Sequence, residues 1–213
     1  MNNNYLPTDY QTFIATSRYA RWLEEEGRRE TWGETVERYL ENIAKTWLKP
    51  VDLQEIREAI LSLEVMPSMR SLMTAGKASD RDNTCMYNCS YLPVDDPKSY
   101  DEAMFILLCG TGVGFSVERQ FITKLPDVPT LFQSETCVVI KDSKEGWAKG
   151  LRQVLALLWA GEIPKWDVSR VRPAGARLKT FGGRASGPAP LVDLFNFAVT
   201  TFCLLYTSPS PRD

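Results

Sequence analysis

Two cysteines four positions apart, Cys85 and Cys89 in the stretch NTCMYNCSY, have the side chains best suited to chemistry in this sequence. Their spacing differs from the C-x-x-C of zinc ribbons and thioredoxin-type sites, and no second ligand pair follows them. The chain contains no histidine, which excludes a Cys-His or Ser-His dyad and a histidine-bound zinc within it. Spacing alone favours buried or incidental thiols, with a redox-active thiol as the alternative, and it indicates no metal site.

A glycine-rich turn, CGTGVG at residues 109–114, is a second candidate, because glycine lets backbone N–H groups approach a ligand closely. The turn follows a helical pattern and precedes a strand pattern. A dinucleotide-binding fingerprint needs the opposite order, so a Rossmann-type site is excluded. A ligand-binding turn and an ordinary helix-to-strand turn both stay open.

A long basic loop at residues 172–190, RPAGARLKTFGGRASGPAP, is the third candidate. It carries Arg172, Arg177, Lys179 and Arg184 among glycines. Cations on a flexible backbone suit a small ligand that bears phosphate. A solvated basic loop is the alternative on composition alone.

The overall composition is that of an ordinary globular protein, with 44% hydrophobic and 24% charged residues. Lys+Arg is 25 and Asp+Glu is 27, and the absence of a basic tract argues against binding to a nucleic-acid polymer. The N-terminus lacks the pattern of a signal peptide, and no apolar run approaches the ~18 residues of a membrane span. We therefore expect no membrane partner, a cytoplasmic location and reduced thiols.

Helices and strands alternate behind a helical N-terminal region. The first part predicts a helix over 34–48 and a second helix that begins at Asp52, with Glu55 completing a capping box, and ends before Pro67. After Asp96-Pro97 the pattern predicts an apolar helix, strands over 113–118, 135–141 and 165–171, and a capped helix over 142–161. This alternation predicts an α/β body.

The last residues, 203–213 (CLLYTSPSPRD), differ in character from the chain before them. We interpret them as sequencing-adapter read-through and exclude them from the reasoning on the fold. The natural sequence would then be interrupted near Phe202. A short disordered tail is the alternative.

Six stretches, taken together and in order, resemble the adenosylcobalamin-dependent (class II) ribonucleotide reductases, in the monomeric ribonucleoside-triphosphate reductase branch. They are RRETWGETVERY, MPSMRSLMTAG, YNCSYLPVDD, CGTGVGFSVERQ, DSKEGWAKGL and WDVSRVRPAGARLKTFGGRASGPAPL. The resemblance runs from about residue 18 to residue 202. It implies a truncated α/β fold, in which a helical N-terminal region precedes the first part of a ten-stranded α/β barrel.

The resemblance also implies an activity, the thiyl-radical reduction of ribonucleoside triphosphates to 2′-deoxyribonucleoside triphosphates for DNA synthesis. Adenosylcobalamin would generate a thiyl radical that takes the ribose 3′ hydrogen, and two further cysteines would supply electrons by forming a disulfide. A thioredoxin-like reductant would restore the thiols. The radical cysteine, the partner of Cys89 and most cobalamin contacts would lie beyond the truncation, so the resemblance implies an inactive N-terminal fragment of a monomeric enzyme.

The resemblance assigns roles to individual residues. Cys89 would be the first member of the redox-active pair, and Cys85 a bystander. Substrate would contact Asn88, Cys89, Thr111 and Gly112. A deoxynucleotide effector would contact Glu118, Arg119, Gln120, Asp142, Ser143, Arg177, Lys179 and Arg184. The loop over 172–186 would link effector identity to substrate choice.

The predicted domain organisation has three parts: a helical region over 1–75, the first part of the catalytic barrel with effector-binding segments over 76–202, and read-through over 203–213. Two alternatives stay open. One is the large subunit of a ribonucleoside-diphosphate reductase of another class, in which an iron protein supplies the radical. The other is a nonenzymatic module that binds a nucleotide for regulation.

Overall fold

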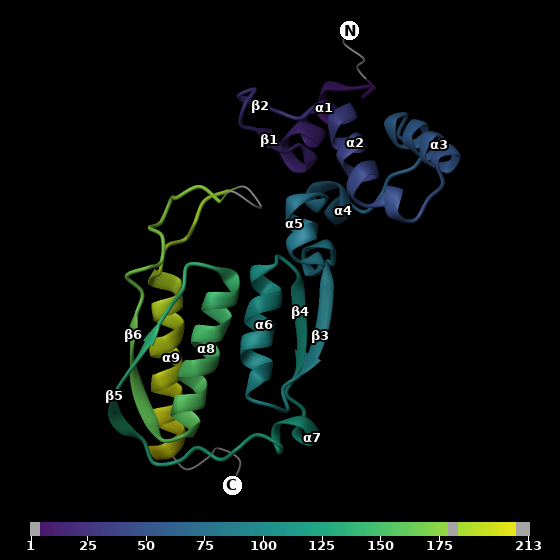
Figure 1. The fold of residues 1–213 in the computed structure, drawn as a ribbon. Coiled ribbons are helices and arrows are strands. Elements are labelled where there is room, and N and C mark those ends of the chain that lie inside the picture. The colour runs from purple at the N-terminus through teal and green to yellow at the C-terminus, as the bar shows by residue number, and fades with distance from the viewer. Residues whose placement is uncertain (1–4, 179–182, 208–213) are drawn as a thin grey trace. The chain divides into compact units, whose positions relative to one another are not determined.

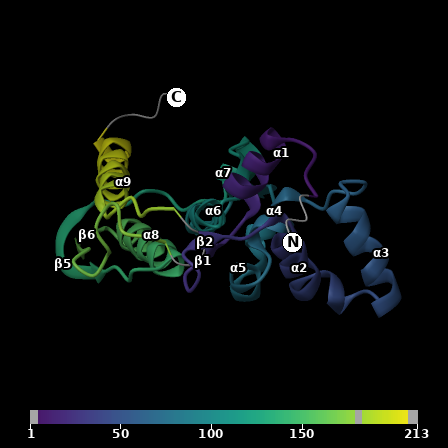
Figure 2. The ribbon, with the colours of Figure 1, turned by 90° about the horizontal axis from the view of Figure 1, so that it is seen from above.

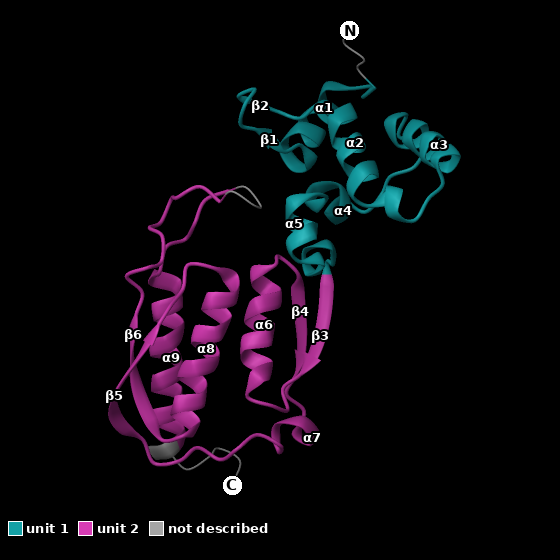
Figure 3. Cartoon of the chain, viewed as in Figure 1, with its two compact units in different colours: residues 1–88, 179–182 teal, residues 89–178, 183–213 magenta. Residues whose placement is uncertain are grey.

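The computed structural model describes residues 5–178 and 183–207, and its contacts divide the chain into two compact units (Figures 1 and 3). The described part of the first unit ends at Asn88, and the second unit begins at Cys89. This division falls later than the boundary after residue 75 that the sequence predicts, and the assignment of the two parts to separate domains stays a prediction.

The first unit is mainly helical, as the sequence predicts. Its elements are α1 (Asp9–Ile14), a π-helix (Ala15–Tyr19), the antiparallel pair β1 (Trp22–Leu23) and β2 (Arg28–Arg29), α2 (Trp32–Asn42), a 3-10 turn (Ala44–Thr46), α3 (Pro50–Leu61), α4 (Met69–Thr74), α5 (Lys77–Arg81) and a second 3-10 turn (Asn83–Met86). Its core gathers Val36 and Leu40 of α2 with Ile60 of α3 and Leu72 of α4. Each of these side chains is buried, so apolar packing joins the three helices.

Two helix boundaries of the first unit differ from the sequence prediction. The helix predicted over 34–48 stops at Asn42, and Trp47, placed on its apolar face, is 83% exposed. α3 begins at Pro50 rather than at Asp52, because proline at the first helical position loses no hydrogen bond and already has a helical φ. The predicted capping box at Asp52 and Glu55 is therefore wrong.

The capping box of this unit lies at the start of α2 instead. The Thr31 hydroxyl accepts from the Glu34 N–H, and the Glu34 carboxylate accepts from the Thr31 N–H. The Arg28 guanidinium also donates to both Glu34 oxygens, at 2.8 and 2.7 Å. Hydrogen bonds from Arg28 and then from Thr31 lower the pKa of Glu34 to about 2.

The Glu34 carboxylate makes the stability of the folded protein depend on pH. Because the folded-state pKa of Glu34 lies below its ordinary value, its contribution is present above about pH 4.5 and is lost as the pH falls toward about 2. Glu34 is partly exposed, so we expect a loss on the order of 1 kcal/mol across this window. Urea denaturation followed by far-ultraviolet circular dichroism should show a smaller acid loss in Glu34→Gln than in the unmodified protein. Equal losses in the two proteins would contradict the assignment.

The second unit consists of two parallel strand pairs with helices packed against them. Its elements are β3 (Cys89–Pro93), α6 (Lys98–Leu108), β4 (Gly112–Ser116), α7 (Arg119–Ile122), β5 (Phe132–Val139), α8 (Lys144–Trp159), β6 (Glu162–Asp167) and α9 (Ala189–Thr207). β3 pairs with β4, and β5 pairs with β6. Each pair is thus a strand–helix–strand unit, which confirms the mixture of helices and strands that the sequence predicts.

α8 occupies the centre of the second unit, between α6 and the β5–β6 pair (Figures 1 and 2). Its buried face, including Val154 and Leu158, packs in one core with Ile140 and with Phe195 of α9. α8 ends at Trp159, and Gly161, just beyond the Ala160 cap, has a φ of +87°, which suits a residue without a side chain. The helix predicted over 142–161 is thus confirmed within two residues at each end.

The strand predictions are confirmed in position, with different ends. The strand predicted over 165–171 appears as β6, which begins earlier and ends at Asp167, whose carboxylate accepts from the Ser169 N–H at 2.8 Å and starts a turn. β3 is a strand that the sequence analysis did not predict. α9 continues past Phe202 through Thr207, and the interpretation of 203–213 as read-through stays a prediction. None of the helices within the described ranges is long and apolar enough to cross a membrane.

Candidate functional site

Cys89 and Gly112, which the resemblance assigns to the substrate site, lie directly beside each other. Cys89 is the first residue of β3, Gly112 is the first residue of β4, and the two are partners in the parallel register. The Ser90 hydroxyl donates to the Gly112 carbonyl oxygen at 3.1 Å, which fixes the two strand starts together. Cys89 is exposed, and its strand neighbour has no side chain to cover it. A ligand can therefore reach this thiol.

Cys85 and Cys89 have opposite environments, although only three residues separate them. Cys85 is fully buried in the 3-10 turn Asn83–Met86 of the first unit. The Asp82 carboxylate caps this turn by accepting from the Thr84 N–H at 3.0 Å. Both cysteines are free of disulfide bonds in the structure. Burial leaves Cys85 without the access that a redox-active thiol needs.

Asn88, the last residue of the first unit, is exposed, and its Oδ1 accepts from Arg70 Nε at 3.2 Å. Its predicted contact with substrate stays a prediction. Thr111 differs from the other predicted substrate residues, because it is 2% exposed.

The turn before Gly112 closes α6 in a regular way. The Gly110 N–H donates to the Leu107 carbonyl at 2.8 Å, and the Thr111 N–H donates to the Ile106 carbonyl at 3.2 Å. With Gly110 at a φ of +83°, these two bonds form a Schellman motif. Gly110 is thus required by the way α6 ends. Gly112, in contrast, is the first residue of β4 and lies beside Cys89.

The predicted effector residues that the structure describes fall at two ends of the second unit. Glu118 precedes α7, and Gln120 Nε2 donates to its carboxylate at 2.9 Å, while Arg119 is exposed beside them. In Figure 1, α7 lies at one end of the unit, and the start of α8 and the basic loop lie at the other. The structure therefore does not bring Glu118, Arg119 and Gln120 to the edge that holds the other predicted effector residues that it describes, which are Asp142, Ser143, Arg177 and Arg184.

At that other edge, Asp142 and Ser143 have defined structural roles. Arg172 Nε donates to both Asp142 oxygens, at 3.0 and 2.8 Å, which ties the first residue of the basic loop to the start of α8. The Ser143 hydroxyl accepts from the Gly146 N–H at 3.0 Å and caps α8.

The basic loop is more regular than its composition indicates. Its two sides pair through the bonds Gly175 N–H to Ala185 O at 2.8 Å and Leu178 N–H to Gly183 O at 2.9 Å. Arg177 and Arg184 face each other in an antiparallel bridge, and Arg184 Nη1 donates to the Gly175 carbonyl at 3.0 Å. Lys179 lies outside the described residues.

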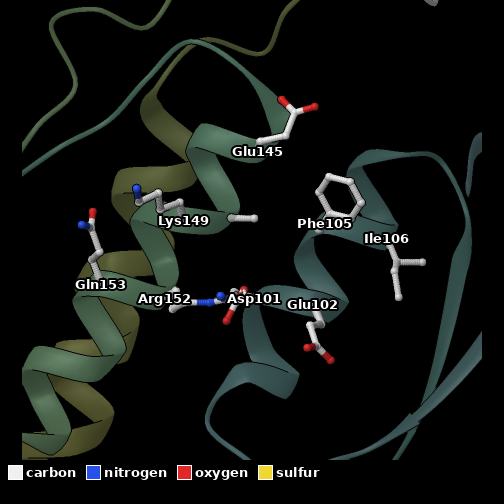
Figure 4. Close-up of a pocket in the computed structure, with 9 residues that line it drawn as sticks. Asp101, Glu102, Phe105, Ile106, Glu145, Lys149, Arg152 and Gln153 are labelled. Carbon is white, nitrogen blue, oxygen red and sulfur yellow. Dashed lines mark hydrogen bonds and ion pairs between the residues drawn. The ribbon is translucent and has the colours of Figure 1, made fainter. Parts of the chain in front are cut away.

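A groove between α6 and α8 was not anticipated from the sequence (Figure 4). It has a volume of about 670 Å³ and is lined by Asp101, Glu102, Phe105, Ile106, Glu145, Ala148, Lys149, Arg152 and Gln153. Asp101 is buried and pairs through Oδ2 with Arg152 at 2.6 Å, and this hydrogen bond raises the pKa of Arg152. Within the described chain, Asp101 Oδ1 accepts no hydrogen bond. The only feature of the sequence that could have indicated this groove is an acidic residue inside an apolar helix pattern.

No metal centre is present in the part of the chain that the structure describes, where histidine, cysteine, aspartate and glutamate side chains never gather in groups of three or more that could hold an ion.

Comparisons with known proteins agree with the resemblance. A family model described as "B12-dependent ribonucleotide reductase, insertion domain" matches residues 128–201, which include β5, α8 and β6. The adenosylcobalamin-dependent ribonucleoside-triphosphate reductase of Lactobacillus helveticus (strain DPC 4571) is 26% identical, over 83% of this chain and 34% of its own length. A protein of Mycobacterium phage D29, provisionally described with the same activity, is 29% identical over 83% of this chain and 30% of its own length.

A solved structure agrees as well. The crystal structure of a B-12-dependent (class II) ribonucleotide reductase superposes with a TM-score of 0.72 and 25% identity, over 91% of this chain and 36% of that chain. This chain spans about a third of the length of the curated relatives that it matches. The comparisons thus confirm the resemblance to the class II reductases, over about a third of the length of those relatives.

Proposed function

We propose, from this confirmed relationship to the class II ribonucleotide reductases, that the full-length protein reduces ribonucleoside triphosphates to 2′-deoxyribonucleoside triphosphates. The activity named for the curated relatives, ribonucleoside-triphosphate reduction, supports the substrate class. The observation that carries the proposal is the exposed Cys89 thiol at the start of β3, in register with Gly112 of β4.

Cys89 serves in this proposal as one of two thiols that reduce the substrate. The ribose 2′-hydroxyl leaves as water, and two thiols become a disulfide, which releases the two electrons that the reduction needs. An external dithiol of the thioredoxin type then exchanges with the disulfide and restores both thiols. Exposure suits Cys89 to this exchange, because the attacking thiolate must reach the sulfur.

The β3–β4 pair would supply the first strands of a ten-stranded barrel. Tyr91 on β3 and Phe115 on β4 are 64% and 65% exposed, as expected for side chains that further parts of a larger fold would cover. The helical region over 1–75 would precede the barrel, and the barrel part over 76–202 would carry the effector-binding segments.

Adenosylcobalamin, when bound, supplies the radical that starts the reaction. The groove between α6 and α8 does not fit it, because several charged side chains line this groove, including the paired Asp101 and Arg152. Its contacts would therefore lie in other parts of the full-length protein, as would the partner of Cys89.

The remaining partners follow from the same proposal. A deoxynucleotide effector would bind near Asp142 and Ser143, beside the paired loop that carries Arg177 and Arg184. The full-length protein would act as a monomer in the cytoplasm. Glu118, Arg119 and Gln120 stay predicted effector contacts without support from their position in the second unit.

The gene that encodes this chain provides a direct test. Downstream of codon 202 it should encode a second redox cysteine and an Asn-Pro-Cys-Gly-Glu-like segment. A natural stop codon at that position would defeat the proposal and favour a nonenzymatic nucleotide-binding module.

Arg184 offers a test of the proposed regulation. Arg184→Ala removes both a cation and the bond that Nη1 donates to the Gly175 carbonyl, so the loop loses charge and internal order. In full-length enzyme, competing ribonucleotides should be reduced with a preference that responds less to each deoxynucleotide effector, by about 5-fold or more. Unstimulated turnover should remain detectable. An unchanged preference pattern would identify the loop as a solvated connection.

A further inference from the structure

We infer that Lys144 is a positioning residue that couples the effector segment at Asp142 and Ser143 to the substrate turn that ends at Gly112. The coupling runs through a hydrogen bond between Lys144 and Cys109. This inference rests on the proposed function, which assigns one of these segments to the effector site and the other to the substrate site.

The contact itself joins the start of α8 to the end of α6. Lys144 Nζ donates to Cys109 Sγ at 3.0 Å, and the same ammonium lies 4.8 Å from the centre of the Phe105 ring. Cys109 is 2% exposed, so the bond lies in surroundings where a charge-assisted hydrogen bond is strong. The cation–π contact with Phe105 holds the ammonium to the same helix end.

On the α6 side, a shift of Cys109 has a short, rigid path to the redox thiol. The Cys109 N–H donates to the Phe105 carbonyl at 3.0 Å, and the Schellman bonds of Gly110 and Thr111 fix the next two residues. Gly112 follows directly and is the register partner of Cys89. A displacement at Cys109 therefore moves the strand start that lies beside Cys89.

On the α8 side, Lys144 is fixed to the predicted effector segment. It is the first residue of α8, directly after the Ser143 cap. A side chain at Gly146 would lie 2.5 Å from the Lys141 carbonyl oxygen, so the chain entering α8 is tightly packed. Asp142 accepts from Arg172, which connects the same segment to the basic loop.

These contacts give one continuous set of links in the second unit, from Arg172 through Asp142, Lys144 and Cys109 to the strand pair at Cys89. Lys144 is the link that a substitution can remove without altering a residue assigned to the substrate or effector site.

The test is a double-mutant cycle in full-length enzyme with Lys144→Met, Cys109→Ala and the double variant. Lys144→Met keeps the length of the side chain but removes the charge and the donor. Competing ribonucleoside triphosphates are reduced with and without each deoxynucleoside triphosphate, and effector affinity is measured directly by equilibrium binding. Each single variant should weaken the effector-dependent change in substrate preference by about 5-fold or more, and the double variant should add little, because both remove the same bond.

Three controls separate coupling from folding and from direct binding. Lys149→Met removes an exposed cation from the same helix and should leave the preference unchanged. Lys144→Arg retains the donor, and Cys109→Ser retains an acceptor. Each variant should therefore keep most of the effector response. Unstimulated turnover and effector affinity should stay near those of the unmodified enzyme in every variant.

Two results would overturn the inference while leaving the proposed function intact. The first is a full effector response in both single variants. The second is a loss of effector affinity in Lys144→Met with normal coupling in Cys109→Ala, which would make Lys144 a direct ligand of the effector. An unmodified full-length protein that forms no deoxynucleotide would instead defeat the proposed function, and the inference with it.

Discussion

Cys89→Ser is expected to abolish repeated turnover in the full-length protein supplied with a dithiol reductant, with product formation reduced to background. Serine has nearly the same size but cannot form the disulfide that supplies two electrons to the substrate. Cys89 is exposed at a strand start, so the substitution removes no packed core atoms and should leave the fold unchanged. The measurement is the amount of deoxynucleotide formed per enzyme over many catalytic cycles.

Two other cysteines serve as controls for this substitution. Cys137→Ser also changes an exposed thiol on a strand and should retain turnover. Cys85→Ser should be mild in its effect on turnover, although the buried position makes a stability loss of about 1 kcal/mol the expected cost. If Cys89→Ser turned over like the unmodified enzyme, the redox assignment would be wrong.

Arg38→Met should cause the largest loss of stability, about 3–5 kcal/mol in the free energy of unfolding. Arg38 Nε and Nη2 donate to the two oxygens of Glu30 at 2.8 and 2.9 Å. The Glu30 side chain is only 6% exposed, so removal of arginine leaves a buried carboxylate without its cation. Burial raises the pKa of Glu30, but the bonds from Arg38 and the Arg21 N–H outweigh it, and the net pKa is lowered.

Arg38 also satisfies three backbone carbonyls from two other segments, which adds to the expected loss. Its guanidinium donates to the carbonyls of Tyr19, Leu72 and Ala75 at 3.2, 2.9 and 3.0 Å. These carbonyls would lose a partner in a poorly hydrated site.

Urea denaturation of Arg38→Met and of a matched surface variant measures this effect. Lys45→Met breaks the exposed pair with Glu41, whose side chains are 62% and 63% exposed, and should cost far less stability than Arg38→Met. Similar losses of unfolding free energy in the two variants would show that the buried Arg38–Glu30 pair stabilises the protein no more than the exposed Lys45–Glu41 pair.

Local sequence patterns account for much of the second unit. The apolar periodicity of α8, its serine cap and the glycine after it are signals carried by neighbouring residues, and the predicted helix matches the structure. The first unit shows the limit of such signals. Trp47 continues the apolar period beyond α2, but the backbone leaves the helix at Ile43 and the ring is exposed.

The parts that the sequence could not predict depend on contacts between distant segments. β3 is short and contains Pro93, and it exists because it pairs with β4. The regular conformation of the basic loop depends on backbone hydrogen bonds between its two sides, which the amino-acid composition does not predict. The Lys144–Cys109 contact requires α6 and α8 to pack together. Residue types and the family resemblance identify Cys89 as a candidate, whereas its position beside Gly112 is a product of strand register.

The most direct test of the account is the conversion of a ribonucleoside triphosphate by the full-length protein in the presence of a dithiol, with and without adenosylcobalamin. The account predicts that the corresponding deoxynucleoside triphosphate forms over many cycles only when adenosylcobalamin is present, and that Cys89→Ser eliminates it. Folded full-length protein that forms no deoxynucleotide with the cofactor, or that forms it equally well without the cofactor, would contradict the account.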